Sequence, residues 1–276
     1  MLPSKRKTLI KQLSFWQPGA IAFSGGVDST LLLALAREAW DRPPLAVTFI
    51  SPLLLSDEIT RIQELVGFLD LPLKCIPSRE YQDPRFKKNP PSRCYHCKKH
   101  RFRLGKSLIK KMGLPYLLDG TNADDLRHYR PGIRAAREAR VISPLAAAGW
   151  TKEEIRQTSR QMGLPNWDLP SSPCLATRIA YGQPITRPLL KRLAQGEAFL
   201  RQMGLKETRL RVHGALIRVE VLPENFSLVL DKKNRAALLA HLSGLGFDTV
   251  TLDLKGFRSG SMDESRPGKR KRNGPA

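Results

Sequence analysis

Short apolar runs alternate with amphipathic segments over the first two-thirds of the chain. The apolar runs predict buried strands at residues 20–23, 45–49, 72–76, 115–119 and, more briefly, 141–143. The segments between them predict a helix whose apolar periodicity begins at Thr30 and further helices that start at Ser56 and near Lys98. A fourth helix is predicted after Thr151, which as N-cap residue has the capping-box pattern with Glu154. This alternation is typical of an α/β fold, in which helices cover both faces of a twisted parallel sheet and ligands bind at the carboxyl ends of the strands.

Two proline-rich segments interrupt this pattern, and both are predicted to be loops because proline has no backbone N–H and ends a helix. Residues 81–91 lead to Cys94 and Cys97 at the start of the basic helix, and residues 165–173 end at Cys174. A third polar loop, over 120–125, follows the fourth strand.

From residue 186 the order of elements changes to helix, strand (208–212), strand (215–221), helix (231–242) and strand (249–254). His213 and Gly214 are suited to a hairpin turn between the first two of these strands. We therefore predict an α/β domain over 1–180, a small α+β domain for substrate binding or oligomerisation over 181–262, and a disordered basic tail over 263–276.

The charge of the chain is strongly positive. The 276 residues have a formal net charge of +22, and residues 265–276 carry five of these charges, which leaves +17 on the rest. Such an excess suits a polyanionic ligand, a nucleic acid or a generally basic surface. No apolar run approaches the roughly 20 residues of a membrane span, and no signal peptide is recognisable, so we expect a cytoplasmic protein without membrane contacts.

The segment between the first strand and its helix is glycine-rich. Gly25 and Gly26 allow a tight turn whose N–H groups face one anion, and the positive end of the helix dipole adds to the attraction. Ser24 and Ser29 supply hydroxyl donors, and Asp28 can cap the helix or bind Mg²⁺. The segment lacks the consensus of a nucleoside-triphosphate P-loop and of a dinucleotide site. It therefore predicts a phosphate loop of another kind.

Three cysteines lie in or beside the predicted loops. Cys94 and Cys97 form a Cys-x-x-Cys pair, and Cys174 lies in the later loop. Zinc usually needs four protein ligands, and here His96 or Cys75 would have to be the fourth. Cys75 falls inside a predicted strand, where we expect it to be buried among apolar residues. Three cysteines and one open position suit a [4Fe-4S] cluster.

Other chemistries remain open for the cysteines. Cys94 and Cys97 could form a redox disulfide. Cys174 could act alone as a nucleophile, with Arg178 lowering the pKa of its thiol. Four cysteines are too few for a disulfide scaffold in a chain of this length.

The small domain carries a cluster of arginines and acids. Arg209 and Arg211 alternate along one strand and therefore share a face, and Arg218 and Glu220 do the same on its partner. Arg258 follows the last strand. Paired arginines on one face are suited to binding a phosphate or a carboxylate, although a solvated sheet edge would have the same pattern.

These motifs together resemble the LarE-type ATP-dependent sulfur transferases of the PP-loop ATP pyrophosphatase superfamily. The resemblance spans roughly residues 18–262. It rests on SGGVDST (24–30), NPPSRCYHCK (89–98), DGTNADDLRHYRPG (119–132), SPL (143–145), GLPNWDLPSSPCLATRIAYGQPIT (163–186), RLRVHG (209–214) and GFRSGSM (256–262).

The resemblance implies synthesis of the nickel-pincer nucleotide used by lactate racemase. ATP is cleaved between its α and β phosphates, and the carboxylates of a pyridinium dicarboxylate mononucleotide are adenylylated and then converted to thiocarboxylates. Asp28 is the expected Mg²⁺ ligand, with Asp124 or Asp125 as a weaker candidate. The residues expected at the nucleotide site are Ser24, Gly25, Gly26, Asp28, Ser29, Thr48, Gly120, Asn122, Asp124 and Arg178.

The number of cysteines divides the family. Members with only the equivalent of Cys174 resemble sacrificial enzymes that give up its sulfur, whereas members with three cysteines resemble cluster enzymes that pass on a bound sulfide. We therefore expect a cluster held by Cys94, Cys97 and Cys174, with a donor protein or free sulfide as the sulfur source, and a homo-oligomer. The main alternatives are a tRNA-thiolating enzyme of the same superfamily, whose basic surface would bind RNA, and a non-catalytic nucleotide-binding regulator.

Overall fold

A computed structural model describes residues 2–127, 129–170, 172–205 and 207–258. The chain divides into two compact units. The first contains the chain up to Asp83 together with 92–172, and the second contains Pro84–Pro91 together with the chain from Pro173 onward. The segments 84–91 and 173–180 thus group with the second unit. The predicted basic tail, 263–276, lies outside the described residues, and the expected domain boundary after residue 180 stays a prediction.

The first unit is built on a four-stranded parallel sheet, as the sequence pattern predicts. Its strands are β1 (Gly19–Ala22), β2 (Leu45–Ile50), β3 (Leu73–Pro77) and β4 (Tyr116–Asp119). They are ordered β3-β2-β1-β4, and every pairing is parallel. The chain moves outward from β1 to β3 and then returns to the other side of β1, so the order reverses between β1 and β4. Ligands of such sheets bind outside the carboxyl ends of the strands at this point.

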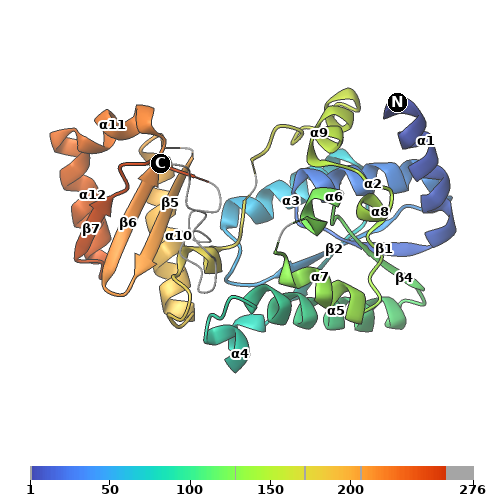
Figure 1. Ribbon diagram of the computed structural model, residues 1–276, viewed down its shortest axis with the longest axis horizontal. Helices are drawn as coiled ribbons and strands as arrows, with labels where there is room; N and C mark the ends of the chain where they lie inside the picture. Colours follow the sequence, from blue (N-terminus) through green and yellow to red (C-terminus); the bar gives the residue numbers. More distant parts are fainter. Residues whose placement is uncertain (1, 128, 171, 206, 259–276) are drawn as a thin grey trace, which may run out of the picture. The chain divides into compact units, whose positions relative to one another are not determined.

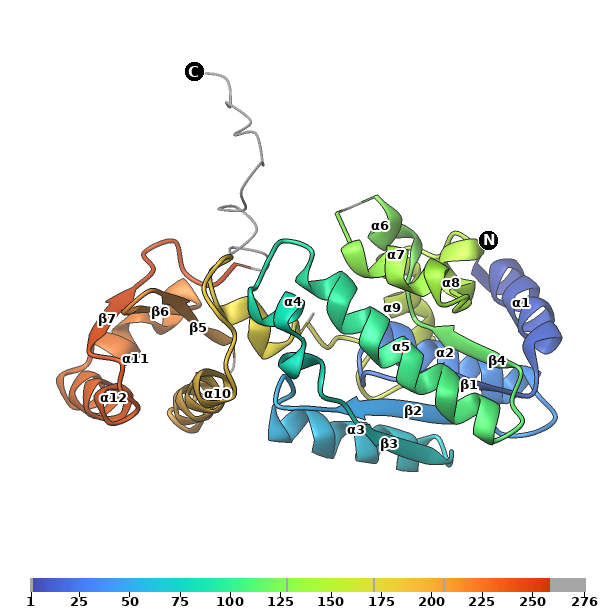
Figure 2. The same ribbon diagram turned by 90° about the horizontal axis from the view of Figure 1, so that it is seen from below.

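Helices cover both faces of this sheet (Figures 1 and 2). The helices of the first unit are α1 (Leu2–Leu13), α2 (Val27–Ala39), α3 (Ser56–Phe68), α5 (Arg93–Lys111), α6 (Ala123–Leu126), α7 (Pro131–Glu138), α8 (Pro144–Ala147) and α9 (Lys152–Gln161), with short 3-10 turns at η1 (Ser14–Trp16) and η2 (Glu80–Gln82). Helix α2 packs against α1 and α9 on one side and β1 on the other. On the opposite face, α5 packs against α7 and β4.

Each face has its own apolar core. The residues Leu31, Leu32 and Leu33 of α2 are fully buried together with Ile21 and Trp150. Phe102 and Ile109 of α5 belong to a second cluster on the other face. Burying a leucine side chain contributes roughly 1.5–3 kcal/mol to the stability of the fold. The two apolar clusters therefore hold β1 and β4 firmly in place.

Several local predictions were wrong. Helix α5 begins at Arg93 rather than near Lys98, so that Cys94 and Cys97 lie within the helix. Residues 141–143 form only an isolated bridge between Ile142 and Leu118, because Pro144 opens α8 directly afterwards. Cys75 is exposed rather than buried, because β3 is the edge strand of the sheet.

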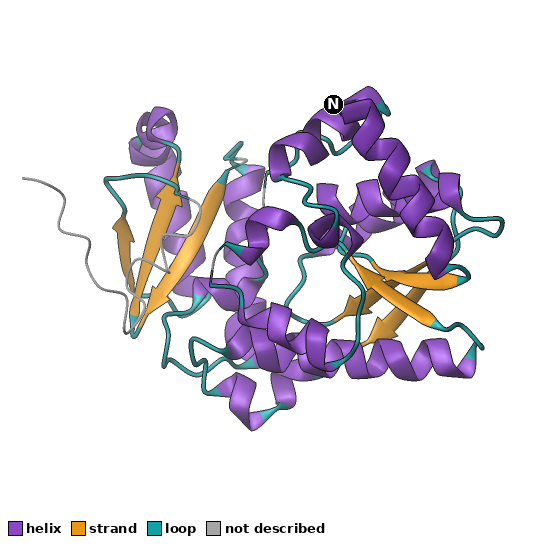
Figure 3. Ribbon diagram, turned by 45° about the vertical axis from the view of Figure 1, so that its right-hand side comes forward, coloured by secondary structure: helices purple, strands orange, loops and turns teal. Residues whose placement is uncertain are grey.

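The second unit contains a small mixed sheet with helices against it (Figure 3). Strands β5 (Thr208–His213) and β6 (Leu216–Val221) form the predicted hairpin, in which Gly214 has a positive φ of 63°. Strand β7 (Thr249–Leu252) pairs parallel with β6. The helical segments of this unit are α4 (Pro84–Lys87), η3 (Leu175–Arg178), α10 (Arg187–Gln202), η4 (Pro223–Asn225), α11 (Phe226–Leu230) and α12 (Lys232–Gly244). Residues 84–87 are helical although a loop was expected there.

The charged and apolar faces of this small sheet are separate. Gly196 of α10 lies so close to β5 that an added Cβ would be 2.5 Å from Leu210. Leu210 therefore marks the face that the helices cover.

In the part of the chain that the structure describes, no helix of either unit is long and apolar enough to cross a membrane.

Candidate functional site

The glycine-rich segment forms a compact loop between β1 and α2. Gly25 has a φ of 72°, a conformation that side-chain-bearing residues rarely adopt. The carbonyl of Gly26 accepts hydrogen bonds from the Thr30 amide and from the Ser29 hydroxyl, each at 3.0 Å. The hydroxyls of Ser24 and Ser29 lie 3.2 Å apart. Both hydroxyls therefore face the same point, at the N-terminus of a 13-residue helix where an anion is stabilised.

Asn166 supports this loop from a distant part of the chain. Its buried side-chain amide donates to the Gly25 carbonyl at 3.1 Å and to the Thr30 hydroxyl at 3.0 Å. The proline-rich loop before Cys174 thus helps to hold the conformation of the phosphate loop. Sequence reasoning missed this role, because nothing in the local pattern links Asn166 to residues so far upstream.

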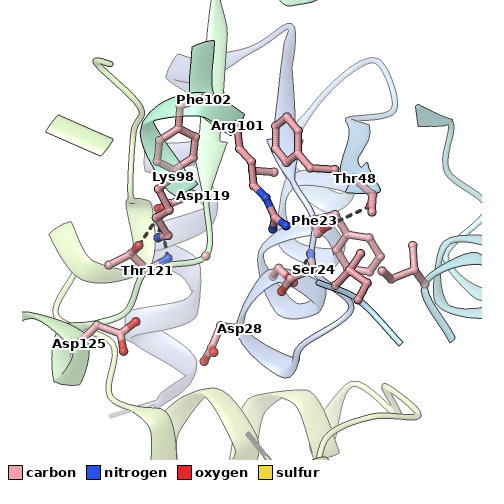
Figure 4. Close-up of a pocket in the computed structure, with 16 residues that line it drawn as sticks. Phe23, Ser24, Asp28, Thr48, Lys98, Arg101, Phe102, Asp119, Thr121 and Asp125 are labelled. Carbon is pink, nitrogen blue, oxygen red and sulfur yellow. Dashed lines mark hydrogen bonds and ion pairs between the residues drawn. The ribbon is translucent and has the colours of Figure 1, made fainter. Parts of the chain in front are cut away.

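A cavity opens beside the phosphate loop at the carboxyl ends of β1, β2 and β4 (Figure 4). Phe49, Leu54 and Ile62 give it an apolar side toward β2 and α3. Asp119, Thr121 and Asp125 give it a polar side toward β4. The remaining lining residues are Ala22, Phe23, Ser24, Asp28, Ser29, Thr48, Lys98, Arg101, Phe102 and Gly120. The cavity can therefore receive a ligand with an apolar ring against Phe49, Leu54 and Ile62 and with phosphate groups at the loop serines.

Asp28 already has two polar partners. One carboxylate oxygen lies 2.7 Å from the Lys152 ammonium group, and the other accepts from the Asn122 amide at 3.3 Å. Asp124 accepts from the Lys152 backbone N–H at 2.7 Å, which joins α6 to the start of α9. Nothing about Lys152 in the sequence indicated this position beyond its place after the predicted N-cap Thr151.

Within the described ranges, no group of three or more His, Cys, Asp and Glu side chains is arranged to hold a metal ion. Mg²⁺ commonly takes only one or two protein carboxylates and completes its shell with phosphate oxygens and water. Asp28 at the mouth of the phosphate loop fits this mode of binding. An all-protein cage is not needed for it.

Two cations of α5 line the cavity, and their acidic partners lie on opposite sides of β1 in the strand order. Lys98 lies 3.4 Å from Asp119, which ends β4 and also accepts from the hydroxyls of Thr121 and Ser143 at 2.8 and 2.7 Å. Arg101 is bound instead by Glu80, which follows β3. Neither cation was among the predicted site residues. Their spacing of three residues on one helix was the only signal that the sequence offered.

Cys94 and Cys97 lie one turn apart at the beginning of the same helix. Cys94 is exposed and Cys97 is half-buried. Between them, Tyr95 donates its hydroxyl to Glu138 at 2.7 Å, and Glu138 also accepts from Arg134 and Lys99. This cluster fastens α7 to the cysteine-bearing end of α5.

The Glu138 cluster predicts a pH dependence. The Tyr95 hydroxyl, the Arg134 guanidinium and the Lys99 ammonium group lower the pKa of Glu138 from 4.5 to about 2. A carboxyl whose pKa is lower in the folded state stabilises it above the unfolded value, and this contribution is lost as pH falls from about 4.5 to about 2. NMR titration of the Glu138 carboxyl should give a midpoint near 2, with Glu138→Gln to assign the signal, and a midpoint near 4.5 would contradict the arrangement.

Cys174 belongs to the second unit, where Arg178 organises its surroundings. Arg178 is 1% exposed, and its Nε and Nη2 lie 2.8 and 3.0 Å from the carboxylate oxygens of Glu197 on α10. Its Nη1 donates to the backbone carbonyls of Pro173 and Cys174. Arg178 therefore fixes the backbone at the half-buried Cys174, which immediately precedes η3.

The predicted arginine cluster lies on one face of the β5–β6 hairpin. The register places Arg209 opposite Glu220 and Arg211 opposite Arg218. Glu220 is fully buried, and its two oxygens accept from Arg211 at 3.0 Å and from Arg218 at 2.9 Å.

The same cluster continues beyond the hairpin. Arg211 donates to the Thr177 carbonyl at 2.9 Å, which ties the charged face to η3. Burial lowers the pKa of the Arg211 guanidinium, and Glu220 partly offsets this effect. Arg218 and Arg258 both approach Asp253, at 3.3 and 3.6 Å, whereas Arg209 packs its guanidinium over the ring of Phe257.

The predicted residues thus fall into three groups. The loop residues, together with Thr48, Gly120, Asn122 and Asp124, gather at the carboxyl edge of the parallel sheet. Cys174, Arg178 and the arginine cluster lie in the second unit. Cys94 and Cys97 belong to the first unit, on the helix that also carries Lys98 and Arg101.

Comparison with known proteins gives three relatives that match nearly the whole chain, and no protein-family model matches. A protein of Synechocystis sp. without an assigned function is 37% identical over 263 residues, which cover 95% of this chain and 98% of the relative. The pyridinium-3,5-bisthiocarboxylic acid mononucleotide synthase of Lactiplantibacillus plantarum is 33% identical over 269 residues, which cover 96% and 95%. A protein of Methanocaldococcus jannaschii without an assigned function is 30% identical over 243 residues, which cover 87% and 90%.

Proposed function

Because the chain belongs to the LarE-type family, which includes the bisthiocarboxylic acid mononucleotide synthase, we propose that it is an ATP-dependent sulfur transferase. Its substrate is a pyridinium dicarboxylate mononucleotide, whose carboxylates become thiocarboxylates for the synthesis of a nickel-pincer nucleotide. The observation that carries the proposal is the phosphate loop, whose Ser24 and Ser29 hydroxyls lie 3.2 Å apart at the end of β1 beside a cavity for a nucleotide.

The first step is activation of the carboxylate. One carboxylate oxygen attacks the α phosphorus of ATP and the bond to the β-phosphate oxygen breaks, which gives an acyl adenylate and pyrophosphate. The loop N–H groups, the hydroxyls of Ser24 and Ser29 and the N-terminus of α2 stabilise the charge on the leaving pyrophosphate. Asp28 would hold a Mg²⁺ ion, which neutralises charge on the phosphates, and Lys152 and Asn122 keep the Asp28 carboxylate in place.

In the second step, a sulfur nucleophile attacks the acyl carbon and AMP leaves with the oxygen that had attacked phosphorus. Cys94, Cys97 and Cys174 are the candidates to hold the sulfur. An all-thiolate donor set suits a [4Fe-4S] cluster, which would supply a binding position for exogenous sulfide. Both Cys97 and Cys174 are half-buried and Cys94 is exposed, so each thiol is placed near a surface where such a group could be received. The second mechanism is sacrifice of the Cys174 sulfur.

The second unit provides a positive face for the substrate. Arg211, Arg218 and Arg258 share the carboxylates of Glu220 and Asp253, and Arg209 lies over the ring of Phe257, so positive charge is in excess. We assign the mononucleotide phosphate to this excess charge. The homo-oligomer and the identity of the sulfur donor stay predictions.

The proposal predicts a product that mass spectrometry can identify. Anaerobically purified protein, incubated with ATP, Mg²⁺, sulfide and the dicarboxylate mononucleotide, should exchange oxygen for sulfur in the substrate carboxylates. Iron and sulfide analysis before turnover, and the mass of the protein afterwards, separate the two sulfur sources. Loss of one sulfur atom from Cys174 without bound iron would reject the cluster mechanism. Retention of tRNA that weakens with salt, with ATP cleavage unaffected by the mononucleotide, would overturn the proposed function in favour of tRNA thiolation.

A further inference from the structure

Arg101 is a cation in the nucleotide cavity to which the steps above give no role. It comes from the third turn of α5, and its side chain is 20% exposed. Figure 4 shows it extending from α5 into the cavity, between Phe102 and the segment of Phe23 and Ser24.

A buried polar network fixes the position of this guanidinium. Glu80 is completely buried and lies 3.1 Å from Arg101 Nε and 2.6 Å from its Nη2. Glu80 also accepts from the hydroxyl of Ser51 at 2.8 Å and from that of Ser78. Burial alone would raise the pKa of Glu80, but Arg101 and the two hydroxyls outweigh it and hold this pKa below its usual value.

Such a network is costly to build. A buried ion pair loses the hydration of both charges, and an apolar pair of similar volume is often at least as stable. Ser51 follows β2, whereas Ser78 and Glu80 follow β3. Ser51 and Glu80 both contact Arg101, and the hydroxyls of Ser51 and Ser78 hold Glu80 in place. The arrangement therefore serves to aim Arg101 rather than to stabilise the unit.

The position of Arg101 relative to the phosphate loop defines what it can touch. The loop at the end of β1 binds the terminal phosphates in the proposed function, and the apolar side of the cavity lies toward β2. A nucleotide whose ring occupies that apolar side and whose pyrophosphate occupies the loop must place its α-phosphate between them. Arg101 is anchored from the β2 and β3 side and lines the same cavity as the apolar side and the loop serines, so its guanidinium can reach a phosphoryl group that lies between them.

We propose that Arg101, aimed by Glu80, is the ligand of the nucleotide α-phosphoryl group. The inference deepens the proposed function and rests on it. Carboxylate attack adds negative charge to the non-bridging oxygens of this phosphorus, and a fixed guanidinium donates to them with no rearrangement at the moment of reaction. When pyrophosphate leaves, Arg101 keeps its bond to the phosphoryl group of the acyl adenylate. Glu80 is a positioning residue, because it acts only through Arg101.

The test measures the binding of AMP and of pyrophosphate separately, by calorimetry on the full chain. AMP contains the α-phosphate but not the phosphates that the loop binds. Pyrophosphate contains the phosphates that the loop binds but not the α-phosphate. Arg101→Lys keeps a positive charge beside Glu80 but loses the planar pair of donors. This substitution should weaken the binding of AMP roughly 10- to 100-fold and leave the affinity for pyrophosphate unchanged. Arg103→Lys, at an exposed position on the same helix, is the matched control and should change neither affinity.

Two further variants keep the test informative. Ser29→Ala should show the reverse selectivity, with weaker pyrophosphate binding and nearly unchanged AMP binding. Glu80→Gln retains the guanidinium but removes its anchor, so it should reproduce part of the AMP-specific loss. Unchanged AMP affinity in Arg101→Lys, or equal losses for both probes, would overturn the inference. A wild-type chain that binds neither probe would instead refute the proposed function.

Discussion

Replacement of Gly120 by alanine is expected to lower ATP cleavage by about 100-fold while the fold stays intact. An added Cβ would lie 2.9 Å from the Ser29 nitrogen, 3.0 Å from the Ser29 Cα and 3.2 Å from the Asp28 carbonyl carbon. These are backbone atoms and have no flexible end that could move aside. The end of β4 and the start of α2 must separate, so the phosphate loop and Asp28 shift away from the cavity.

The same chain offers a matched control for this substitution. Gly67 lies in α3, and an added Cβ there would meet no atom within 4 Å. Gly67→Ala should leave turnover unchanged and increase the free energy of unfolding by up to about 1 kcal/mol, because alanine favours a helix more than glycine does. Pyrophosphate release and the far-UV circular dichroism spectrum should be measured for both variants. If Gly120→Ala turns over like Gly67→Ala, the close approach of β4 and α2 does not position the loop.

The second large effect concerns stability and comes from the Arg178–Glu197 pair. Arg178→Met should lower the free energy of unfolding of the second unit by about 3–5 kcal/mol, because it leaves the fully buried Glu197 carboxylate without its cation. Glu197 would still accept from the Leu210 amide at 3.1 Å, which is insufficient to compensate a buried charge. The Cys174 loop would also lose the donor that holds its carbonyl groups.

Urea unfolding checks this expectation against two other variants. Arg235→Met makes the same change at an exposed position of α12 and should alter the free energy of unfolding by no more than about 0.5 kcal/mol. A double variant, Arg178→Met with Glu197→Leu, removes both charges and should recover part of the loss. A transition of Arg178→Met that coincides with that of Arg235→Met would show that the ion pair does not hold this region together.

The sequence predicts the features of this fold that depend on local patterns. The four strands of the parallel sheet are short apolar runs between polar turns, and Thr151 with Glu154 forms the expected capping box at the start of α9. The phosphate loop is recognisable because its two glycines and two serines are contiguous. The hairpin at Gly214 follows from its turn residues in the same way.

What the sequence could not predict depends on long-range packing. The start of α5 was missed because residues 89–92, which precede it, are rich in proline and asparagine and resemble a loop, although the helix begins directly after Ser92. Cys75 was expected to be buried because a strand's place at the edge of a sheet is not encoded in its own residues. Alternation placed Arg211 and Glu220 correctly on one face, but the burial of their ion pair depends on η3.

Two of the residues that line the cavity also could not be predicted from local sequence patterns. Lys98 and Arg101 belong to a basic helix and resemble solvent-facing residues in the sequence. Their importance comes from their contacts with Asp119, which ends β4, and with Glu80, which follows β3; no local rule in the sequence pairs these acids with them. A search for cations spaced three or four residues apart near a predicted ligand edge would have found them.

Isotope transfer from the substrate carboxylate tests the central claim most directly. The acceptor mononucleotide is labelled with ¹⁸O in its carboxylates and incubated with ATP, Mg²⁺ and the sulfur source, and the AMP is analysed by mass spectrometry. If the phosphate loop promotes carboxylate attack on the α phosphorus, AMP should contain one ¹⁸O atom for each sulfur atom incorporated into the mononucleotide. Thiocarboxylate formation with unlabelled AMP, or with ADP and labelled phosphate as the products, would contradict the account.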